Sequence, residues 1–127
     1  MFKFLLVFIG GGVGSICRYA TALLSFRFLG AAFPYGTLIA NLMGCFLIGI
    51  CFQLVERAAW FGLSARLLFM TGFLGGLTTF STFALETVVA QRKGALTLSI
   101  INFIANNILG LAMVLAGMLL VQHLFKD

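Results

Sequence analysis

Charged side chains are scarce in this sequence of 127 residues: only 9% are Asp, Glu, Lys or Arg, and just three of them are acidic. A soluble domain carries about 25% charged residues, so the composition excludes an ordinary soluble globular protein. The hydrophobic fraction of 62% and the mean hydropathy of +1.17 instead indicate an integral membrane protein. The formal net charge of +5 comes mostly from loop residues that face lipid headgroups, so we predict no nucleic-acid partner.

The sequence also lacks the motifs of metal and catalytic centres. Its three cysteines, Cys17, Cys45 and Cys51, lie in apolar stretches without the CxxC spacing of a metal or redox site. We interpret them as small packing residues. No convincing nucleophile and base pair, metal cluster or phosphate-binding loop is present, and therefore no enzyme is predicted.

Long apolar runs, in contrast, make up most of the chain. Four such segments cover residues 4–27, 35–55, 65–90 and 95–122. Each exceeds the roughly 20 residues that a helix needs to cross the hydrocarbon core. The single proline, Pro34, directly precedes the second segment and suits a helix start, because it has no N–H to leave unpaired. We predict an all-α membrane protein with one integral-membrane domain over residues 1–127 and four transmembrane helices.

Basic residues are divided almost evenly between the two sides of such a protein. Four spans place four of them, Lys3, Arg57, Arg66 and Lys126, on one side, and three, Arg27, Arg92 and Lys93, on the other. This division gives almost none of the asymmetry by which the positive-inside rule selects one orientation. Insertion in both orientations is therefore permitted, and with it an antiparallel, dual-topology homodimer. Four helices are also few to enclose a hydrated pathway alone, and we therefore expect a dimer on architectural grounds as well.

The third apolar segment contains the most unusual run, GFLGGLTTFSTFALE, over residues 72–86. Unpaired polar groups are costly in hydrocarbon, so the hydroxyl groups of this run must face protein, water or an ion. The Gly75-Gly76 pair lies near the bilayer midplane and predicts a break in the third helix there. Carbonyl groups freed by a break are good ligands for a hard cation such as sodium. Phe80 and Phe83, three residues apart, share a helix face, and their positive ring edges can attract an anion; plain packing is the alternative interpretation.

Other polar residues lie deep in the remaining segments. Arg18 and Asn41 occur at comparable depth on one side of the membrane, and together they offer N–H donors suited to an anion. Glu86 can pair with Arg18, border a pathway or titrate. Asn102 and Asn106 are four apart and share a face, where they either line a groove or bond to another helix.

These residues together resemble the CrcB, or Fluc, family of fluoride channels over essentially the whole chain. The resemblance rests on the glycine-rich first helix before Arg18, on residues 36–44, and on residues 75–83 followed by Glu86. It implies a channel that exports fluoride passively across the bacterial inner membrane and so relieves fluoride toxicity. It also implies an antiparallel homodimer with two pores and a structural sodium ion, bound at the dimer centre by the backbone carbonyls of Gly75 and Thr78.

The resemblance further implies roles for individual pore residues. Phe80 and Phe83 would contact fluoride through their ring edges, and Asn41 would be a pore-lining donor. The full set of predicted pore residues is Arg18, Asn41, Phe80, Ser81, Thr82, Phe83, Glu86 and Asn106. One position departs from the family pattern: Gly110 stands where members often carry a serine, which leaves the contacts of the fourth helix open.

Two other classes remain as alternatives. A small four-helix, dual-topology multidrug exporter has the same length and charge balance, but it needs an intramembrane carboxylate, typically in its first helix, where this chain has Arg18. An assembly or scaffold protein would account for a helical bundle, but not for the Gly-Gly and Thr-Phe-Ser-Thr-Phe run.

Overall fold

Four long helical segments make up the described part of the chain, residues 1–58 and 61–125 of a computed structural model. The first two are α1 (Phe2–Leu29) and α2 (Tyr35–Arg57). The third consists of α3 (Leu63–Ala65), the π-helical η1 (Arg66–Leu74), α4 (Gly75–Leu77) and α5 (Phe80–Arg92), and the fourth of α6 (Leu96–Ile104), the π-helical η2 (Ala105–Leu109) and α7 (Gly110–Leu124). All four segments are long and apolar enough to cross a membrane, and their ends differ from the predicted ones by at most two residues.

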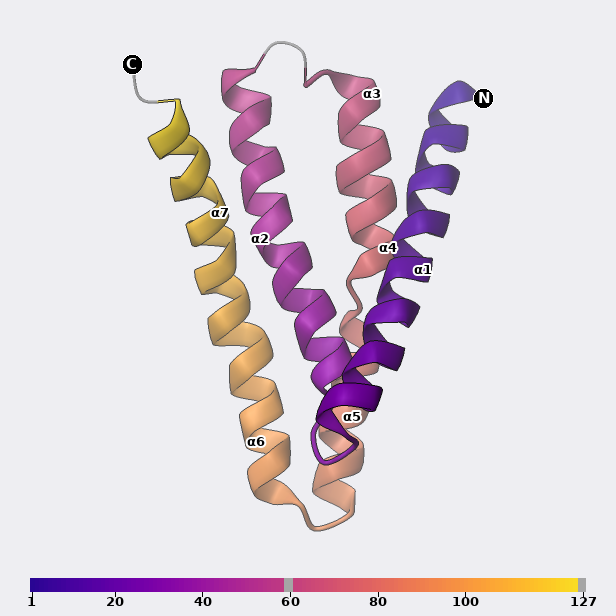
Figure 1. Cartoon of the computed structure of the whole chain (residues 1–127), viewed down its shortest axis with the longest axis vertical. Coiled ribbons are helices and arrows are strands. Elements are labelled where there is room, and N and C mark those ends of the chain that lie inside the picture. The colour runs from indigo at the N-terminus through magenta and orange to yellow at the C-terminus, as the bar shows by residue number, and fades with distance from the viewer. Residues whose placement is uncertain (59–60, 126–127) are drawn as a thin grey trace.

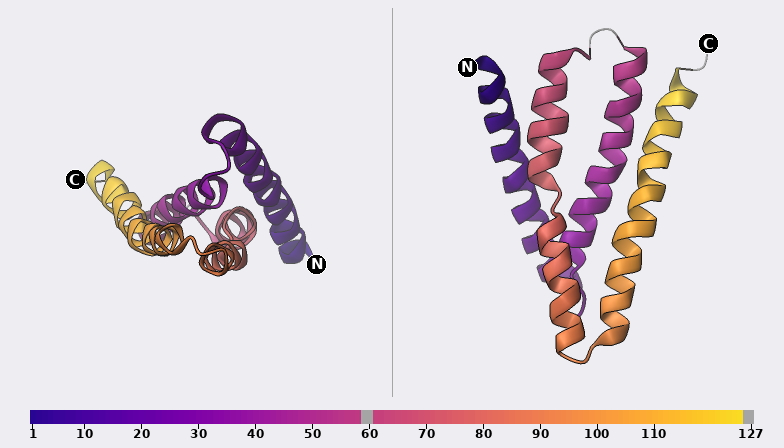
Figure 2. Two further views of the ribbon diagram at one scale, coloured as in Figure 1. Left: turned by 90° about the horizontal axis from the view of Figure 1, so that it is seen from below. Right: turned by 180° about the vertical axis from the view of Figure 1, so that it is seen from behind.

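The start of α1 and the end of α7 lie at the same end of the molecule as the end of α2 and the start of α3 (Figure 1). The other two connections, residues 30–34 and 93–95, lie at the opposite end, toward which the helices converge (Figures 1 and 2). Six of the seven basic residues counted above therefore lie at the predicted ends. Three lie at one end, Lys3, Arg57 and Arg66, and three at the other, Arg27, Arg92 and Lys93. The seventh, Lys126, lies outside the described residues.

Glycines allow the helix backbones to approach closely. A Cβ on Gly14 of α1 would clash with the Phe73 carbonyl of η1, and a Cβ on Gly76 of α4 would clash with the Gly11 carbonyl of α1. Gly49 and Gly117 have the same relation where α2 packs against α7, which is the most extensive contact between two elements. Small residues at such crossings are typical of membrane helices, because lipid provides no hydrophobic force that would drive the helices together.

The break in the third helix lies at Thr78 and Thr79, and the prediction of a break at Gly75-Gly76 was wrong. Gly75 and Gly76 are helical and belong to α4. The backbone is extended at Thr78 (φ −85°, ψ 155°) and at Thr79 (φ −149°, ψ 115°), and helix resumes at Phe80. The break is visible in Figure 2 as the thin segment between the two halves of the third helix.

The glycine pair has packing roles in place of a helix-breaking one. Gly76 lies against α1, where any side chain would meet the backbone of Gly11. Gly75 is on the open side of the helix, and a Cβ there would meet no atom within 4 Å. A helical glycine costs only about 1 kcal/mol relative to alanine, so tertiary contacts outweigh its weak propensity. The helix instead breaks where another side chain can pair with the released backbone groups.

Candidate functional site

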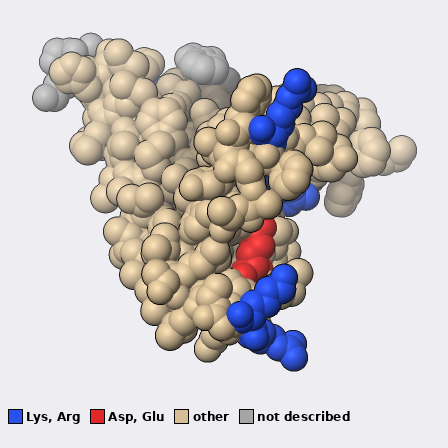
Figure 3. All heavy atoms as spheres, turned by 60° about the horizontal axis from the view of Figure 1, so that its bottom comes forward, with Lys and Arg blue, Asp and Glu red and all other residues tan. Residues whose placement is uncertain are grey.

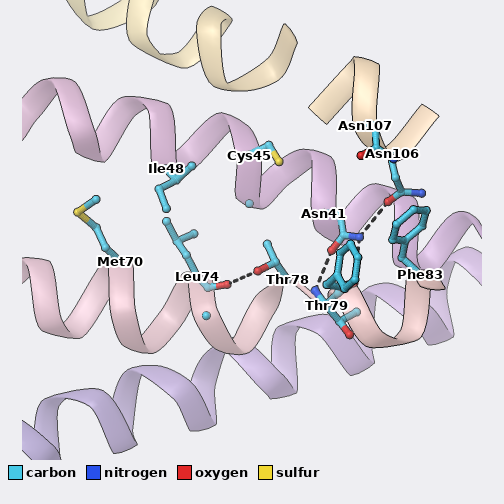
Figure 4. Close-up of a pocket in the computed structure, with 13 residues that line it drawn as sticks. Asn41, Cys45, Ile48, Met70, Leu74, Thr78, Thr79, Phe83, Asn106 and Asn107 are labelled. Carbon is cyan, nitrogen blue, oxygen red and sulfur yellow. Dashed lines mark hydrogen bonds between the residues drawn. The ribbon is translucent and has the colours of Figure 1, made fainter. Parts of the chain in front are cut away.

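The side chain that pairs with the backbone groups released at the break is Asn41 of α2. Its Oδ1 accepts a hydrogen bond from the Thr79 N–H at 2.8 Å, and its Nδ2 donates to the Thr79 carbonyl at 3.2 Å. Figure 4 shows the carboxamide beside the backbone of Thr79. Because no water in the hydrocarbon core can satisfy these groups, a broken helix needs such a replacement. Asn41 thus supplies a side-chain equivalent of the lost helical pairing.

Thr79 also begins the next helix. Its Oγ1 accepts from the Thr82 N–H at 3.2 Å, which is a helix N-cap, and donates to the Thr82 hydroxyl at 3.0 Å. The Ser81 hydroxyl lies 3.3 Å from the same Oγ1. Ser81 and Thr82 are exposed on the protomer surface. The start of α5 therefore combines hydroxyl groups with the positive end of a helix dipole.

Arg18 reaches the break from α1. Its guanidinium donates to the Thr78 carbonyl at 3.3 Å. It does not pair with Glu86, whose Oε1 accepts a 2.7 Å bond from the Thr37 hydroxyl of α2. The ion pair with Arg18, one of the three predicted roles of Glu86, is therefore not formed.

The other carboxylate oxygen of Glu86, Oε2, is buried and has no partner among the described residues. Glu86 lines a pocket of about 460 Å³ together with Thr37 and Lys93. This pocket lies at the end of the molecule that carries the connections at residues 30–34 and 93–95. On the face shown in Figure 3, acidic atoms lie in a hollow near basic side chains. A carboxylate thus faces space that a charged or hydrogen-bonding group can enter.

Phe80 and Phe83 are in contact, but their environments differ. Their ring centroids are 5.6 Å apart at an interplanar angle of 67°, an edge-to-face arrangement. Phe83 is only 5% exposed and also contacts Phe103, with ring centroids 6.3 Å apart. Phe80 is 77% exposed. Packing within the protomer fixes Phe83, whereas Phe80 projects outward.

The asparagines of the fourth helix are joined to the break. Asn106 Oδ1 accepts from Asn41 Nδ2 at 2.9 Å (Figure 4). Since Asn41 Nδ2 carries two hydrogens and also donates to Thr79, both are engaged. Asn102 bonds to another helix, which decides between its two predicted roles: its Nδ2 donates to Thr87 Oγ1 of α5 at 2.9 Å.

Two adjacent asparagines of the π-helical segment η2 also bond to its backbone. Asn106 Nδ2 donates to the Asn102 carbonyl at 3.0 Å, and Asn107 Nδ2 donates to the Phe103 carbonyl at 2.7 Å. Asn107 is nevertheless exposed in the middle of a membrane span.

These groups border one pocket of about 370 Å³ between α2, the third helix and the fourth. Its lining includes Asn41, Gly75, Thr79, Phe80, Phe83 and Asn107. Gly110 lies beside it, and a Cβ there would come within 3.4 Å of Cys45 Sγ. The structure thus brings Asn41, Phe80, Phe83 and Asn106 to one place, while Glu86 lies at the separate pocket nearer the loops.

The carbonyls of Gly75 and Thr78, which were predicted to bind sodium, both lie beside the break. In an unbroken helix the Gly75 carbonyl would accept from the Thr79 N–H, but that N–H donates to Asn41. The Thr78 carbonyl accepts from Arg18 and has a second lone pair. Two oxygens are too few for a hard cation, so a single protomer does not complete such a site.

Among the residues outside the predicted set that contribute to these contacts are three threonines, Thr37, Thr79 and Thr87. Thr79 had a sequence signal, because a threonine directly before an apolar helix is typical of an N-cap. Thr37 and Thr87 had none, since their partners lie on other helices and only the folded chain brings them together.

Comparison with known proteins assigns the chain to a family. Residues 5–118 match the family described as CrcB-like protein, Camphor Resistance (CrcB). The chain belongs to the CrcB family. Similar relatives include the fluoride-specific ion channel FluC of Agrobacterium fabrum, 42% identical over 98% of this chain and 100% of the relative. The proteins of the same name from Parabacteroides distasonis and Aeromonas salmonicida are 40% and 44% identical, over 98% and 95% of this chain and 96% and 97% of their own lengths. This CrcB chain is accordingly a multi-pass protein of the bacterial cell membrane.

Replacing Asn41 with leucine should severely destabilise the protein. Asn41→Leu keeps the side-chain volume but leaves the Thr79 N–H and carbonyl unpaired, at a cost of roughly 2–6 kcal/mol for two buried groups. We expect a large fall in the yield of folded protein and in its thermal unfolding temperature in detergent. Met43→Leu, at an exposed position of the same helix, is the control and should behave like the wild type. Equal stability of the two variants would contradict the bridging role of Asn41.

Proposed function

We propose that this protein is a fluoride-selective channel that lets fluoride leave the cell passively and so relieves fluoride toxicity. The relatives named fluoride-specific ion channels match nearly the whole chain. The structural observation that best supports the proposal is the helix broken at Thr78 and Thr79, with donors and aromatic rings directly after the break. A multidrug exporter is less well supported, because Arg18 occupies the first helix where such a protein needs a carboxylate.

The start of α5 suits a small, strongly hydrated anion. Fluoride gives up water only if several donors replace it. Near the break it meets the Arg18 guanidinium, the hydroxyl groups of Ser81 and Thr82, and the positive end of the α5 dipole. Asn41 adds an N–H donor once one of its two protein bonds is exchanged for the anion.

The phenylalanines extend this path along α5. Phe80, Phe83 and Glu86 occur at intervals of three residues and cover about 9 Å of helix. A ring edge attracts an anion without a fixed full charge, so it can hold fluoride weakly enough to release it. Glu86 and Thr37 then border the path at the end near the connections of residues 30–34 and 93–95.

The exposed polar side chains within the spans support the proposal that a second copy of the chain completes the wall of the pathway. Ser81, Thr82 and Asn107 are exposed within membrane spans, where contact with lipid would be costly. Phe80 and the open side of Gly75 border the same pocket as Asn107. With nearly equal basic charge at the two ends, the two copies would be antiparallel and would form two pores.

A structural sodium ion would then lie on the two-fold axis of this dimer. Two copies bring together four oxygens, the carbonyls of Gly75 and Thr78 from each. The ion would neutralise these converging dipoles and add a fixed positive charge between the pores.

Proteoliposomes test the proposed function directly. Loaded with fluoride or chloride and given a counter-ion path, they should release fluoride rapidly and retain chloride. Chloride loss as fast as fluoride loss, or fluoride flux that depends on a proton or sodium gradient, would rule out a passive fluoride-selective channel.

Removing a ring edge should reduce flux without preventing assembly. Phe80→Ile and Phe83→Ile keep apolar bulk but remove the aromatic quadrupole, and each should lower fluoride efflux about tenfold or more. Leu85→Ile, exposed on the same helix, should conduct like the wild type. Wild-type efflux from both phenylalanine variants would assign the rings to packing alone.

Orientation can be tested through charge. Several lysines added at the end that carries Arg92 and Lys93 should force one topology and abolish efflux, because antiparallel pairs can no longer form. Co-expression with a variant that is biased in the opposite sense should restore efflux. If the forced variant conducts normally when expressed alone, the dimer is not antiparallel.

A further inference from the structure

A continuous chain of side-chain hydrogen bonds joins the break in the third helix to the contact between α5 and α6. It runs from the Thr79 backbone through Asn41, Asn106 and Asn102 to Thr87. Every link is 2.8–2.9 Å long. Asn102 within this chain is 0% exposed, so no lipid or water competes for its amide.

The two ends of this chain impose the same direction on it. At one end the Thr79 N–H can only donate, so Asn41 must present its oxygen there and its Nδ2 to Asn106. At the other end the Phe83 carbonyl can only accept. The Thr87 hydroxyl therefore donates to that carbonyl, at 2.8 Å, and accepts from Asn102 Nδ2.

The directions of the two remaining amides, Asn102 and Asn106, are then determined. Asn102 presents its Oδ1 to Asn106, whose Nδ2 donates to that oxygen at 2.9 Å and to the Asn102 carbonyl at 3.0 Å. Asn106 can offer only its Oδ1 to Asn41. A flipped Asn106 would place its Nδ2 against the Nδ2 of Asn41, and two donors facing each other repel.

We propose that Thr87 and Asn102 are positioning residues of the fluoride path, which hold the Asn106 amide with its Oδ1 toward the Asn41 Nδ2 at the break. The inference rests on the proposed function, since it takes Asn41 to contact fluoride. Neither residue lines the pocket beside the break. Both act through Asn106, and the network also ties the backbone of Phe83 to the fourth helix.

The test uses variants of Thr87 in fluoride efflux from proteoliposomes. Thr87→Val keeps the shape but removes the acceptor for Asn102 Nδ2, so the Asn102 amide can flip and turn its Nδ2 against the Nδ2 of Asn106. We expect fluoride efflux to fall about fivefold or more, the scale of coupling within one hydrogen-bond network. Thr87→Ser restores the hydroxyl and should return efflux to within about twofold of the wild type.

Two further variants separate positioning from simple structural support. Ser99 is buried and bonds the same two helices, from its Oγ to the Thr87 carbonyl at 2.8 Å, but lies outside the amide chain. Ser99→Ala should therefore leave efflux nearly unchanged. In an Asn106→Ala background, Thr87→Val should have no further effect, because the residue through which Thr87 acts is gone.

The outcomes distinguish the inference from the proposed function. A wild type without fluoride efflux defeats the proposed function itself. With a conducting wild type, the inference is overturned if Thr87→Val and Thr87→Ser behave alike, if Ser99→Ala matches Thr87→Val, or if the Thr87→Val effect persists without Asn106. If Thr87→Val does not assemble, Thr87→Cys replaces it. Its thiol is a weak acceptor and should give the same pattern with a smaller loss.

Discussion

The structure depends on the requirement that every backbone polar group in hydrocarbon has a partner. An unbroken helix meets this requirement by itself, but the third span is extended at Thr78 and Thr79. Their carbonyls and the Thr79 N–H are paired by Arg18 from the first helix and Asn41 from the second. Three helices must therefore be correctly placed before the break can exist at all.

The same requirement connects stability to the proposed transport. Groups that pair the broken backbone are also those suited to receive an anion, since guanidinium and carboxamide N–H groups are donors. In the structure both Nδ2 hydrogens of Asn41 are engaged by protein oxygens. An arriving fluoride would have to compete with Asn106 for one of them. Such competition favours brief binding, which a conducting path needs.

The sequence predicts the spans well because length and hydropathy alone determine them. The sequence misplaces the break because helix propensity is a local property, whereas the glycine at position 76 is required by close packing against α1. Asn41, Phe80 and Phe83 could be selected as unusual residues in an apolar setting, and the structure brings them to one pocket. The direction of the amide chain through Asn102 and Thr87 could not be predicted, since the links of Asn41 to Asn106 and of Asn102 to Thr87 join residues on different helices.

The third span, although continuous in sequence, is shared between two packing units. Its first half, η1 and α4, packs against α1, whereas its second half, α5, packs mainly against α6. No helical hydrogen bond from Thr79 links the halves, and the Asn41 side chain contacts the break from α2. Because the extended backbone of Thr78 and Thr79 joins the two halves, we expect any small rotation of one unit against the other to be concentrated there. Asn41, bonded to both the N–H and the carbonyl of Thr79, would restrain that rotation.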